Sequence, residues 1–343
     1  LVRSRGLGDV YKRQHLALPP MAPRRLPFYL AMEEWAALTL PADEYFFEWR
    51  VAPTVICGRN QDIAREVDLD YCRREGIDVV RRKSGGGAVY ADMDNYMFSY
   101  ITPGSEVTST FSRYTTMIVA MLGALGIEAR ATGRNDILIG NGKVAGNAFY
   151  HTHGRSIAHG TMLYDFDPGR LLRAITPSRA KLESKAVTST PMRVTSLKAN
   201  GIKLGLEEFG AFAVDFLCKD EQRELSIDDI AEIEAIEQTY YDPEYFNGHN
   251  RQNRGRVADI SRHKRVEGVG EFDIAINLAP DSTIEGLGIW GDFFVSGDIN
   301  SDIIEPLTGV GYNKRSLSGV ISTLEPSAVI TGLSRSNLLN LLI

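Results

Sequence analysis

The stretch that decides the fold is VVRRKSGGGAVY, residues 79–90. Val79 and Val80 lead into three cations, a serine and three glycines, and a second strand-like run follows. Two strands joined by a glycine turn would gather backbone N–H groups and cationic side chains around one concavity, which suits an anion. The same residues also describe a simple hairpin with an exposed basic patch, and short glycine motifs often occur without such a site. Taken alone, the stretch leaves both interpretations open.

Composition limits the class of protein. The chain has 343 residues, 43% of them hydrophobic and 24% charged, which is typical of a globular protein and long enough for two domains. A net charge of −6 argues against nucleic acid as the main partner, but residues 81–83 still offer a local basic site for a small anion. No apolar run approaches the length of a membrane span.

The cysteines indicate a reducing environment. Cys57, Cys72 and Cys218 are odd in number and have no close metal-ligand spacing. A disulfide framework or zinc site is therefore not expected, and a cytoplasmic location fits best.

Changes in sequence character suggest three regions. Residues 1–24 are basic and lack a long apolar core, so we expect a disordered or extraneous leader, with Met21 as a plausible true start. Residues 25–245 alternate apolar and polar patterns and form a large domain. The polar, glycine-containing segment 242–256 has a linker composition, and residues 246–343 predict a small α+β domain.

Periodicity predicts the elements around the glycine turn. Helices are expected from Pro27 to Pro41, over 62–75, over 111–126, and in two segments after residue 205, whereas strands are expected over 45–49, 54–57 and 77–82. A further strand region after the turn is interrupted by an acidic turn at 92–95. Residues 178–197 are polar, basic and irregular, which is compatible with a functional loop.

Two later segments also combine glycines with polar or charged residues. Asn135-Asp136-Ile137 leads to a tight turn at 140–142 and then to GKVAGN, residues 142–147. HGTML follows at 159–163. Glycines beside Lys143 would let a ligand lie against the backbone.

In this order, the segments resemble the lipoate–protein ligase A family of the biotin/lipoate protein ligase superfamily. The family's marks are R-x-S-G-G-G-A-V, N-D-I, G-K-[small]-[small]-G-N-A and H-G-T-L-L. Residues 58–61, 184–185 and 193–197 continue the likeness, which is close over 27–200 and looser over 240–310, where GDFF at 291–294 looks like part of the accessory domain. One departure is ADMDN at 91–95, where the family often has H-D-x-G-N and only Asn95 matches.

The resemblance implies a fold and a reaction. The fold is α+β, with a biotin/lipoate ligase-like catalytic domain whose mostly antiparallel sheet is flanked by helices, plus a small α+β C-terminal accessory domain. The reaction is a two-step acyl transfer. Lipoate attacks the α-phosphorus of ATP to give lipoyl-AMP and pyrophosphate, and a carrier lysine then takes the acyl group and releases AMP.

The same resemblance implies the site residues. Lys143 and Asp136 are the expected catalytic pair. The expected substrate and adenylate contacts are Arg82, Ser84, Gly85, Gly86, Gly87, Ala88, Asn95, Asn135, Lys143, Gly146, Asn147, His159, Gly160 and Lys185.

The chemistry explains why these residue types are needed. Two anions meet in the first step, so cations and amides must neutralise the charge that builds there. Lys143 can touch the acid and the α-phosphate as a compact charge, with Arg82 sharing that work. Asp136 could hold Mg²⁺ or orient the incoming amine.

Other interpretations of single residues stay open. Asn135 could instead close an Asx turn. His159 could be a structural histidine, and we expect it as a pocket wall rather than a general base. Lys185 could close over the adenylate or remain a solvated charge.

The implied co-substrates are ATP with Mg²⁺ and lipoate, without a tightly bound prosthetic group. The implied partners are lipoyl carrier domains of 2-oxoacid dehydrogenase acyltransferase subunits and the glycine cleavage H protein. We expect a monomer that binds neither nucleic acid nor membrane.

Three rival functions remain. An octanoyl transferase of the same fold would need an activated cysteine in the pocket, and no cysteine lies in the expected loops. A biotin–protein ligase has a related hairpin, but the glycine turn and HGTML fit lipoate better. A non-catalytic lipoate-binding module would keep the pocket without adenylation.

Overall fold

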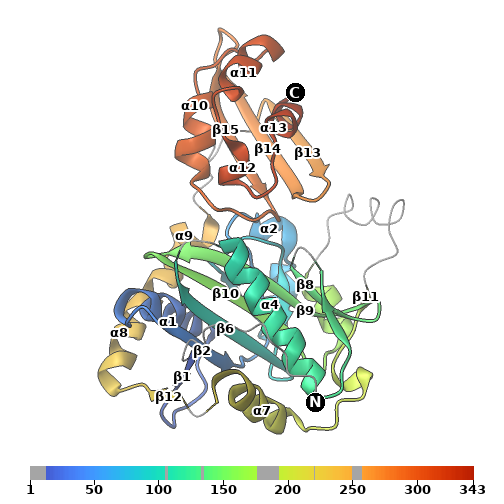
Figure 1. Cartoon of the computed structure of the whole chain (residues 1–343). Coiled ribbons are helices and arrows are strands. Elements are labelled where there is room, and N and C mark those ends of the chain that lie inside the picture. The colour runs from blue at the N-terminus through green and yellow to red at the C-terminus, as the bar shows by residue number, and fades with distance from the viewer. Residues whose placement is uncertain (1–12, 105–106, 133–134, 176–192, 220, 249–256) are drawn as a thin grey trace.

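The computed structural model describes residues 13–104, 107–132, 135–175, 193–219, 221–248 and 257–343. The larger part of this chain is a layered α+β domain, and the C-terminal part forms a second, smaller body at one end of it (Figure 1). The predicted two-part α+β architecture is confirmed.

The main sheet is mostly antiparallel. Its order is β12-β1-β2-β6-β10-β9-β8-β7, with β11 also paired to β9. Pairing is parallel at the β12-β1-β2 end and between β11 and β9, and antiparallel elsewhere. The strands are β1 (Arg13–Ala17), β2 (Glu44–Trp49), β6 (Asn95–Pro103), β7 (Ala129–Ala131), β8 (Asp136–Ile139), β9 (Gly142–Thr152), β10 (Arg155–Leu163), β11 (Arg193–Val194) and β12 (Gln222–Glu224).

Helices cover both faces of this sheet. Strand alternation sends Phe47 and Trp49 to the core beneath α1 (Leu26–Thr39) and α8 (Ile227–Glu237). Phe46 points the other way, to the core beneath α4 (Val107–Ala124) and α7 (Leu206–Cys218). Figure 1 shows α4 lying across the sheet, with α1 and α8 on the opposite side. The sheet is therefore buried on both faces, which explains its nearly continuous apolar strands.

A second sheet carries the glycine turn. Its order is β4-β3-β5, formed by β4 (Asp78–Arg81), β3 (Thr54–Cys57) and β5 (Val89–Ala91). Strands β4 and β5 both pair with β3 and not with each other, so residues 82–88 form a broad loop and not a tight hairpin turn. The small helices α2 (Ile63–Glu66), α3 (Leu69–Glu75) and α5 (Pro168–Ala174) accompany this sheet. Their apolar residues form one core with it.

The C-terminal part has its own core. The antiparallel sheet β13-β14-β15 comprises β13 (Ile260–Val266), β14 (Gly270–Leu278) and β15 (Ile284–Gly291). Helices α10 (Glu305–Leu307), α11 (Lys314–Ile321), α12 (Pro326–Val329) and α13 (Arg335–Leu342) pack with it in one apolar cluster. Before it come a 3₁₀ turn (Gln238–Tyr241) and α9 (Pro243–Asn247).

Two predictions about local structure were wrong. Residues 13–17 lie within the expected leader, but they form β1 between β2 and β12 with Leu16 buried, so they belong to the fold. The helix expected over 62–75 is two helices. Asp62 and Asp68 each cap a separate N-terminus, and Val67 between them is extended.

Candidate active site

The three segments singled out in the sequence meet around one cavity of about 110 Å³. The glycine turn comes from the small sheet, and the other two segments come from the β8–β9 hairpin and from β10 of the main sheet. The lining residues are Leu30, Trp49, Ile56, Arg82, Gly86, Gly87, Ala88, Val89, Met97, Asn135, Lys143, Gly146, Asn147, Ala148, His159, Gly160, Thr161 and Phe294.

Ten of the residues expected from the sequence line this cavity. They are Arg82, Gly86, Gly87, Ala88, Asn135, Lys143, Gly146, Asn147, His159 and Gly160. Ser84, Gly85, Asp136 and Asn95 are not part of the lining, although the first three contact residues that are. Lys185 lies outside the described residues.

Asn95 has a structural role in this geometry. Its side chain is 1% exposed and donates to the Asp92 carboxylate over 2.9 Å, and its backbone N–H donates to the Asp92 carbonyl. These bonds close the acidic turn that opens β6. Asn95 does not line the cavity, and its contact with the substrate stays a prediction.

Part of the cavity wall is apolar. Leu30 of α1, Ile56 of β3 and Met97 of β6 converge there from three separate elements, next to the Trp49 ring. Such a lining accepts a hydrocarbon chain without leaving polar groups unpaired.

The lining also includes Lys143, which forms an ion pair with Asp136. Lys143 Nζ lies 2.6 Å from Asp136 Oδ1, and the Asp136 side chain is only 9% exposed. Register explains the meeting, because Asp136 pairs with Gly146 and one extra residue on β9, Val144, then brings Leu138 opposite Lys143. A side chain at Gly146 would press on Lys143 Cε and Nζ, so glycine leaves the space that the lysine occupies. The hairpin thus fixes one ammonium group at the cavity wall.

Asp136 offers limited support for a metal. The described residues contain no group of three or more His, Cys, Asp and Glu side chains that could hold an ion. Mg²⁺ in nucleotide sites commonly takes one or two carboxylates together with phosphate oxygens and water. A single carboxylate shared with Lys143 fits an ion held mainly by substrate.

Arg82 was expected to bind the substrate anion, but in the structure its guanidinium binds the protein itself. Its guanidinium donates to Ser84 Oγ (2.9 Å) and to the carbonyls of Ile56 (2.9 Å), Gly85 (2.7 Å) and Gly87 (2.9 Å). Burial lowers the pKa of Arg82 to about 10. Although Arg82 borders the cavity, these donors hold the glycine turn in shape.

The neighbouring cations are engaged as well. The Arg81 guanidinium is also buried and holds the loop at 58–61 together. It donates to the carbonyl oxygens of Gly58, Arg59, Gln61 and Phe246. Lys83 lies 2.5 Å from the Glu34 carboxylate. The expectation of an exposed basic patch at 81–83 is therefore wrong for both arginines.

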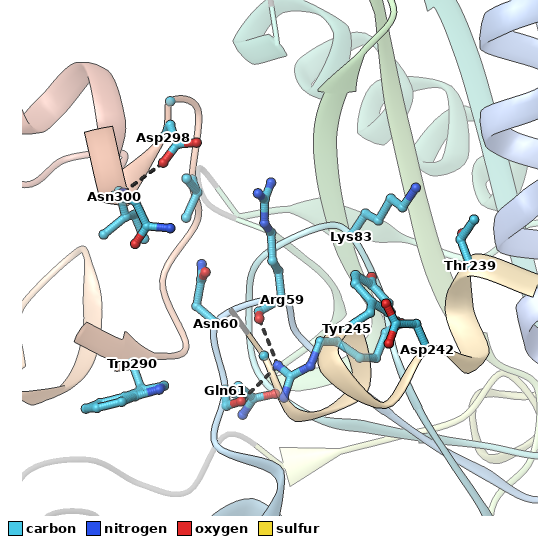
Figure 2. A pocket seen from close by; sticks show the side chains of 15 residues that line it. Arg59, Asn60, Gln61, Lys83, Thr239, Asp242, Tyr245, Trp290, Asp298 and Asn300 are labelled. Carbon is cyan, nitrogen blue, oxygen red and sulfur yellow. Dashed lines mark hydrogen bonds between the residues drawn. The ribbon is translucent and has the colours of Figure 1, made fainter. Parts of the chain in front are cut away.

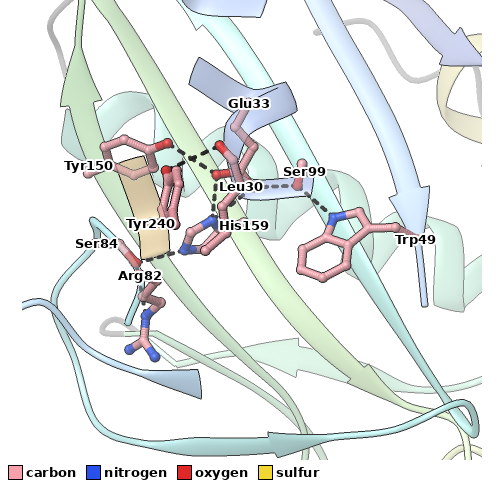
Figure 3. Close-up of polar contacts among 9 residues, drawn as sticks. All are labelled: Leu30, Glu33, Trp49, Arg82, Ser84, Ser99, Tyr150, His159 and Tyr240. Atoms are coloured by element: carbon pink, nitrogen blue, oxygen red, sulfur yellow. Dashed lines mark hydrogen bonds and ion pairs between the residues drawn. The ribbon is translucent and has the colours of Figure 1, made fainter. Parts of the chain in front are cut away.

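A chain of buried polar contacts links the glycine turn to α1 (Figure 3). Ser84 Oγ contacts His159 Nε2 at 2.7 Å, and His159 Nδ1 lies 2.9 Å from Glu33 Oε1. Glu33 also accepts from the hydroxyls of Ser99 (2.5 Å) and Tyr150 (3.2 Å). Because both ring nitrogens of His159 have partners, the residue suits the expected role in the pocket wall.

Glu33 was missed in the sequence, although a signal existed. It is completely buried, and the helix pattern places it on the apolar side of α1, where a charged residue is uncommon. The Ser99 hydroxyl accepts from Trp49 Nε1 over 2.9 Å, which extends the contacts to the apolar part of the cavity wall.

A second, larger cavity of about 380 Å³ lies between the two bodies (Figure 2). Arg59, Asn60 and Gln61 face Trp290, Asp298 and Asn300 across it. None of the residues expected to bind substrate lines it. The smaller cavity is therefore the better candidate site.

The cysteines are unsuited to catalysis. All three are buried and none lines the 110 Å³ cavity. Burial raises the pKa of Cys57 and of Cys218 to about 12, and it also raises that of Cys72. No activated thiolate is available for a thioester mechanism.

A cavity with an apolar wall, a glycine turn and a fixed ammonium group suits an enzyme that handles a carboxylic acid with an apolar chain. Comparison with known proteins agrees. Residues 26–216 match the lipoyl protein ligase A/B catalytic domain, and residues 257–342 match the bacterial lipoate protein ligase C-terminus.

Relatives and solved structures extend the match to nearly the whole chain. Lipoate–protein ligase 1 of Staphylococcus aureus is 32% identical, and LplJ of Bacillus subtilis is 30% identical, each over 91% of this chain and 95% of the relative. Plasmodium falciparum LipL1, solved in complex with lipoate, has a similar fold (TM-score 0.72, 20% identity, 96% of this chain and 97% of the other). This chain belongs to the lipoate–protein ligase family.

Proposed function

We propose that this enzyme joins lipoate to a lysine of a carrier protein in two steps that consume ATP. The observation that carries the proposal is the Lys143–Asp136 pair at a cavity whose wall is partly apolar. The acyl chain would enter among Leu30, Ile56 and Met97, which brings its carboxylate toward Lys143.

In the first step, a carboxylate oxygen attacks the α-phosphorus of ATP and the bond to the β-phosphate oxygen breaks, releasing pyrophosphate. The Lys143 ammonium is placed to lie between the two anions and to stabilise the charge that develops. Asp136 holds that ammonium and keeps it from turning into solvent. Mg²⁺, held by phosphate oxygens with Asp136 as one protein ligand, would lower the charge of the phosphates.

In the second step, the carrier's amine attacks the acyl carbonyl, AMP leaves, and an amide forms. The attacking amine must lose protons. Asp136 is the carboxylate nearest to the ammonium site, and its oxygen could orient that amine once the adenylate occupies Lys143.

The proposed partners are small lipoyl carrier domains, those of 2-oxoacid dehydrogenase acyltransferase subunits and the glycine cleavage H protein. A solved Thermoplasma acidophilum lipoate–protein ligase with a similar fold (TM-score 0.60) is described together with its E2 lipoyl domain. We further propose a cytoplasmic monomer with a catalytic domain before residue 246 and an accessory domain after it. The buried free thiols fit a reducing compartment.

The test mixes the pure protein with lipoate, Mg-ATP and an apo carrier domain. We expect pyrophosphate release and a lipoyl mass increment on one carrier lysine, both strictly dependent on ATP. A parallel reaction with octanoyl acyl carrier protein and no ATP should give no transfer. Binding of lipoate with neither product would instead indicate a non-catalytic binding module.

A further inference from the structure

The segment Gly291-Asp292-Phe293-Phe294 leaves the C-terminal sheet and reaches the candidate site. Phe293 is fully buried in its own domain, where its ring stacks on Phe272 with centroids 4.6 Å apart. Phe294 turns the other way. It is a lining residue of the 110 Å³ cavity, and it is the one lining residue that comes from the C-terminal part of the described chain.

The C-terminal domain holds this segment firmly. Asp292 Oδ1 accepts from the Glu271 N–H over 2.7 Å, and the Phe294 carbonyl accepts from the Thr331 N–H over 3.0 Å. A side chain at Gly291 would collide with the Glu271 carbonyl. The position of Phe294 is therefore set by the C-terminal domain.

The segment docks on the two loops beside the cavity. Gly86 N–H donates to the Phe293 carbonyl over 3.1 Å, and Gly291 N–H donates to the Asn60 carbonyl over 2.9 Å. A methyl group at Gly85 would collide with the Phe293 carbonyl oxygen. Close backbone contact between the two domains thus requires glycine at the turn.

The Phe294 ring completes an aromatic stack. It lies parallel to Phe149 of β9, with centroids 5.0 Å apart and planes 16° apart, and Phe149 packs on Phe111 of α4. A side chain at Gly86 would meet the Phe294 ring at 3.2 Å. The ring is 6% exposed, so it is held between the glycine turn and the main sheet.

We propose that Phe294 is a pocket-wall residue for lipoate supplied by the C-terminal domain, and that it and the Phe293 carbonyl hold the glycine turn in its substrate-binding shape. This inference rests on the proposed function and deepens it. The acid-binding pocket is then built by both domains, which gives the accessory domain a direct part in binding lipoate.

The test compares Phe294→Ala with two matched controls by calorimetric titration of lipoate. Phe216→Ala makes the same chemical change on the partly exposed face of α7, away from the cavity. Arg65→Ala removes a different contact between the domains, the 3.2 Å ion pair with Asp273, without touching the cavity. Melting temperatures of all variants identify any that fail to fold.

We expect the lipoate dissociation constant to rise about tenfold or more in Phe294→Ala, because the loss of even one apolar group from a hydrophobic pocket changes ligand selection by about that factor. Phe294→Leu, which restores much of the volume, should return it to within about threefold of wild type. Both controls should bind like wild type.

An unchanged dissociation constant in Phe294→Ala would overturn the inference. Equal weakening in Arg65→Ala would do so as well, because it would show that domain contact alone matters. Failure of the wild-type protein to bind lipoate or release pyrophosphate would instead count against the proposed function.

Discussion

Glu33 allows the sharpest energetic prediction. Replacing it with alanine removes the acceptor for three buried donors: the Ser99 hydroxyl, the Tyr150 hydroxyl and a ring nitrogen of His159. These residues are 0%, 6% and 5% exposed, so water cannot easily replace the carboxylate. Tyr150 stays protonated as a donor, because burial raises its pKa well above the ordinary value and the nearby Glu33 charge adds to that effect.

The magnitude follows from counting donors. A buried donor left without a partner costs about 1–3 kcal/mol. The two hydroxyls can rotate toward other acceptors, so the lower end applies and the total is about 3 kcal/mol. For a domain of this size, 1 kcal/mol shifts the melting temperature by about 2–4 °C, which gives a drop of about 6–12 °C for Glu33→Ala.

The assay is thermal unfolding followed by circular dichroism, with two comparison variants. Glu33→Gln keeps the shape and one acceptor oxygen, so its melting temperature should lie between those of Glu33→Ala and wild type. Glu207→Ala breaks an ion pair with Arg50 in which the Glu207 side chain is 75% exposed, so it should shift the melting temperature by no more than about 2 °C. A Glu33→Ala variant that melted within about 2 °C of wild type would show that these hydrogen bonds do not stabilise the fold.

Three further predictions concern the site. Lys143→Ala should lower lipoate-dependent pyrophosphate release by about 10²–10³-fold, as loss of a group that stabilises developing charge does elsewhere; near-normal release would refute the role of Lys143, and a melting curve checks that the variant folds. Gly85→Ala should weaken lipoate binding, because the added Cβ collides with the C-terminal domain. The control Gly123→Ala adds a Cβ in α4 that meets no atom within 4 Å, so it should leave lipoate affinity unchanged and stability unchanged or slightly higher. Equal lipoate affinity in both variants would contradict the steric argument. The native thiols should resist alkylation at pH 8 and react rapidly in urea. Burial raises the folded pKa of Cys57 and Cys218 to about 12, so the stabilisation by these neutral thiols is complete below the unfolded pKa of 9 and is lost as the pH rises toward 12. The free energy of unfolding should therefore fall over that interval. A variant with all three cysteines replaced by serine should keep its ligase activity and show a shallower fall.

Local patterns predicted the elements that build the site. The β8–β9 hairpin could be expected from its Asn-Gly turn, and the pairing of Asp136 with Lys143 follows once the hairpin forms. The general α+β fold came from the resemblance, because periodicity alone could not order the strands. The two strands around 89–103 illustrate this limit, since β5 and β6 are nearly continuous in sequence yet belong to different sheets.

Long-range contacts explain what the sequence could not show. Arg82 looks like an anion ligand in its own segment, and only the folded chain reveals that its donors are taken by carbonyls at 56, 85 and 87. Glu33 lies 126 residues from His159, so no local pattern connects them. Residue type indicates chemistry, but the available partners decide how that chemistry is used.

Two of the three glycines of the turn, Gly85 and Gly86, allow close packing. Gly86 has φ of +91°, which favours glycine, and its carbonyl lies so near Gly58 that a side chain at 58 would collide with it. The Gly86 N–H donates to the Phe293 carbonyl, so it does not donate to a phosphate oxygen while the two domains make this contact. A loop that cradles phosphates needs its N–H groups directed at the ligand. The glycine turn is therefore the surface on which the C-terminal domain packs.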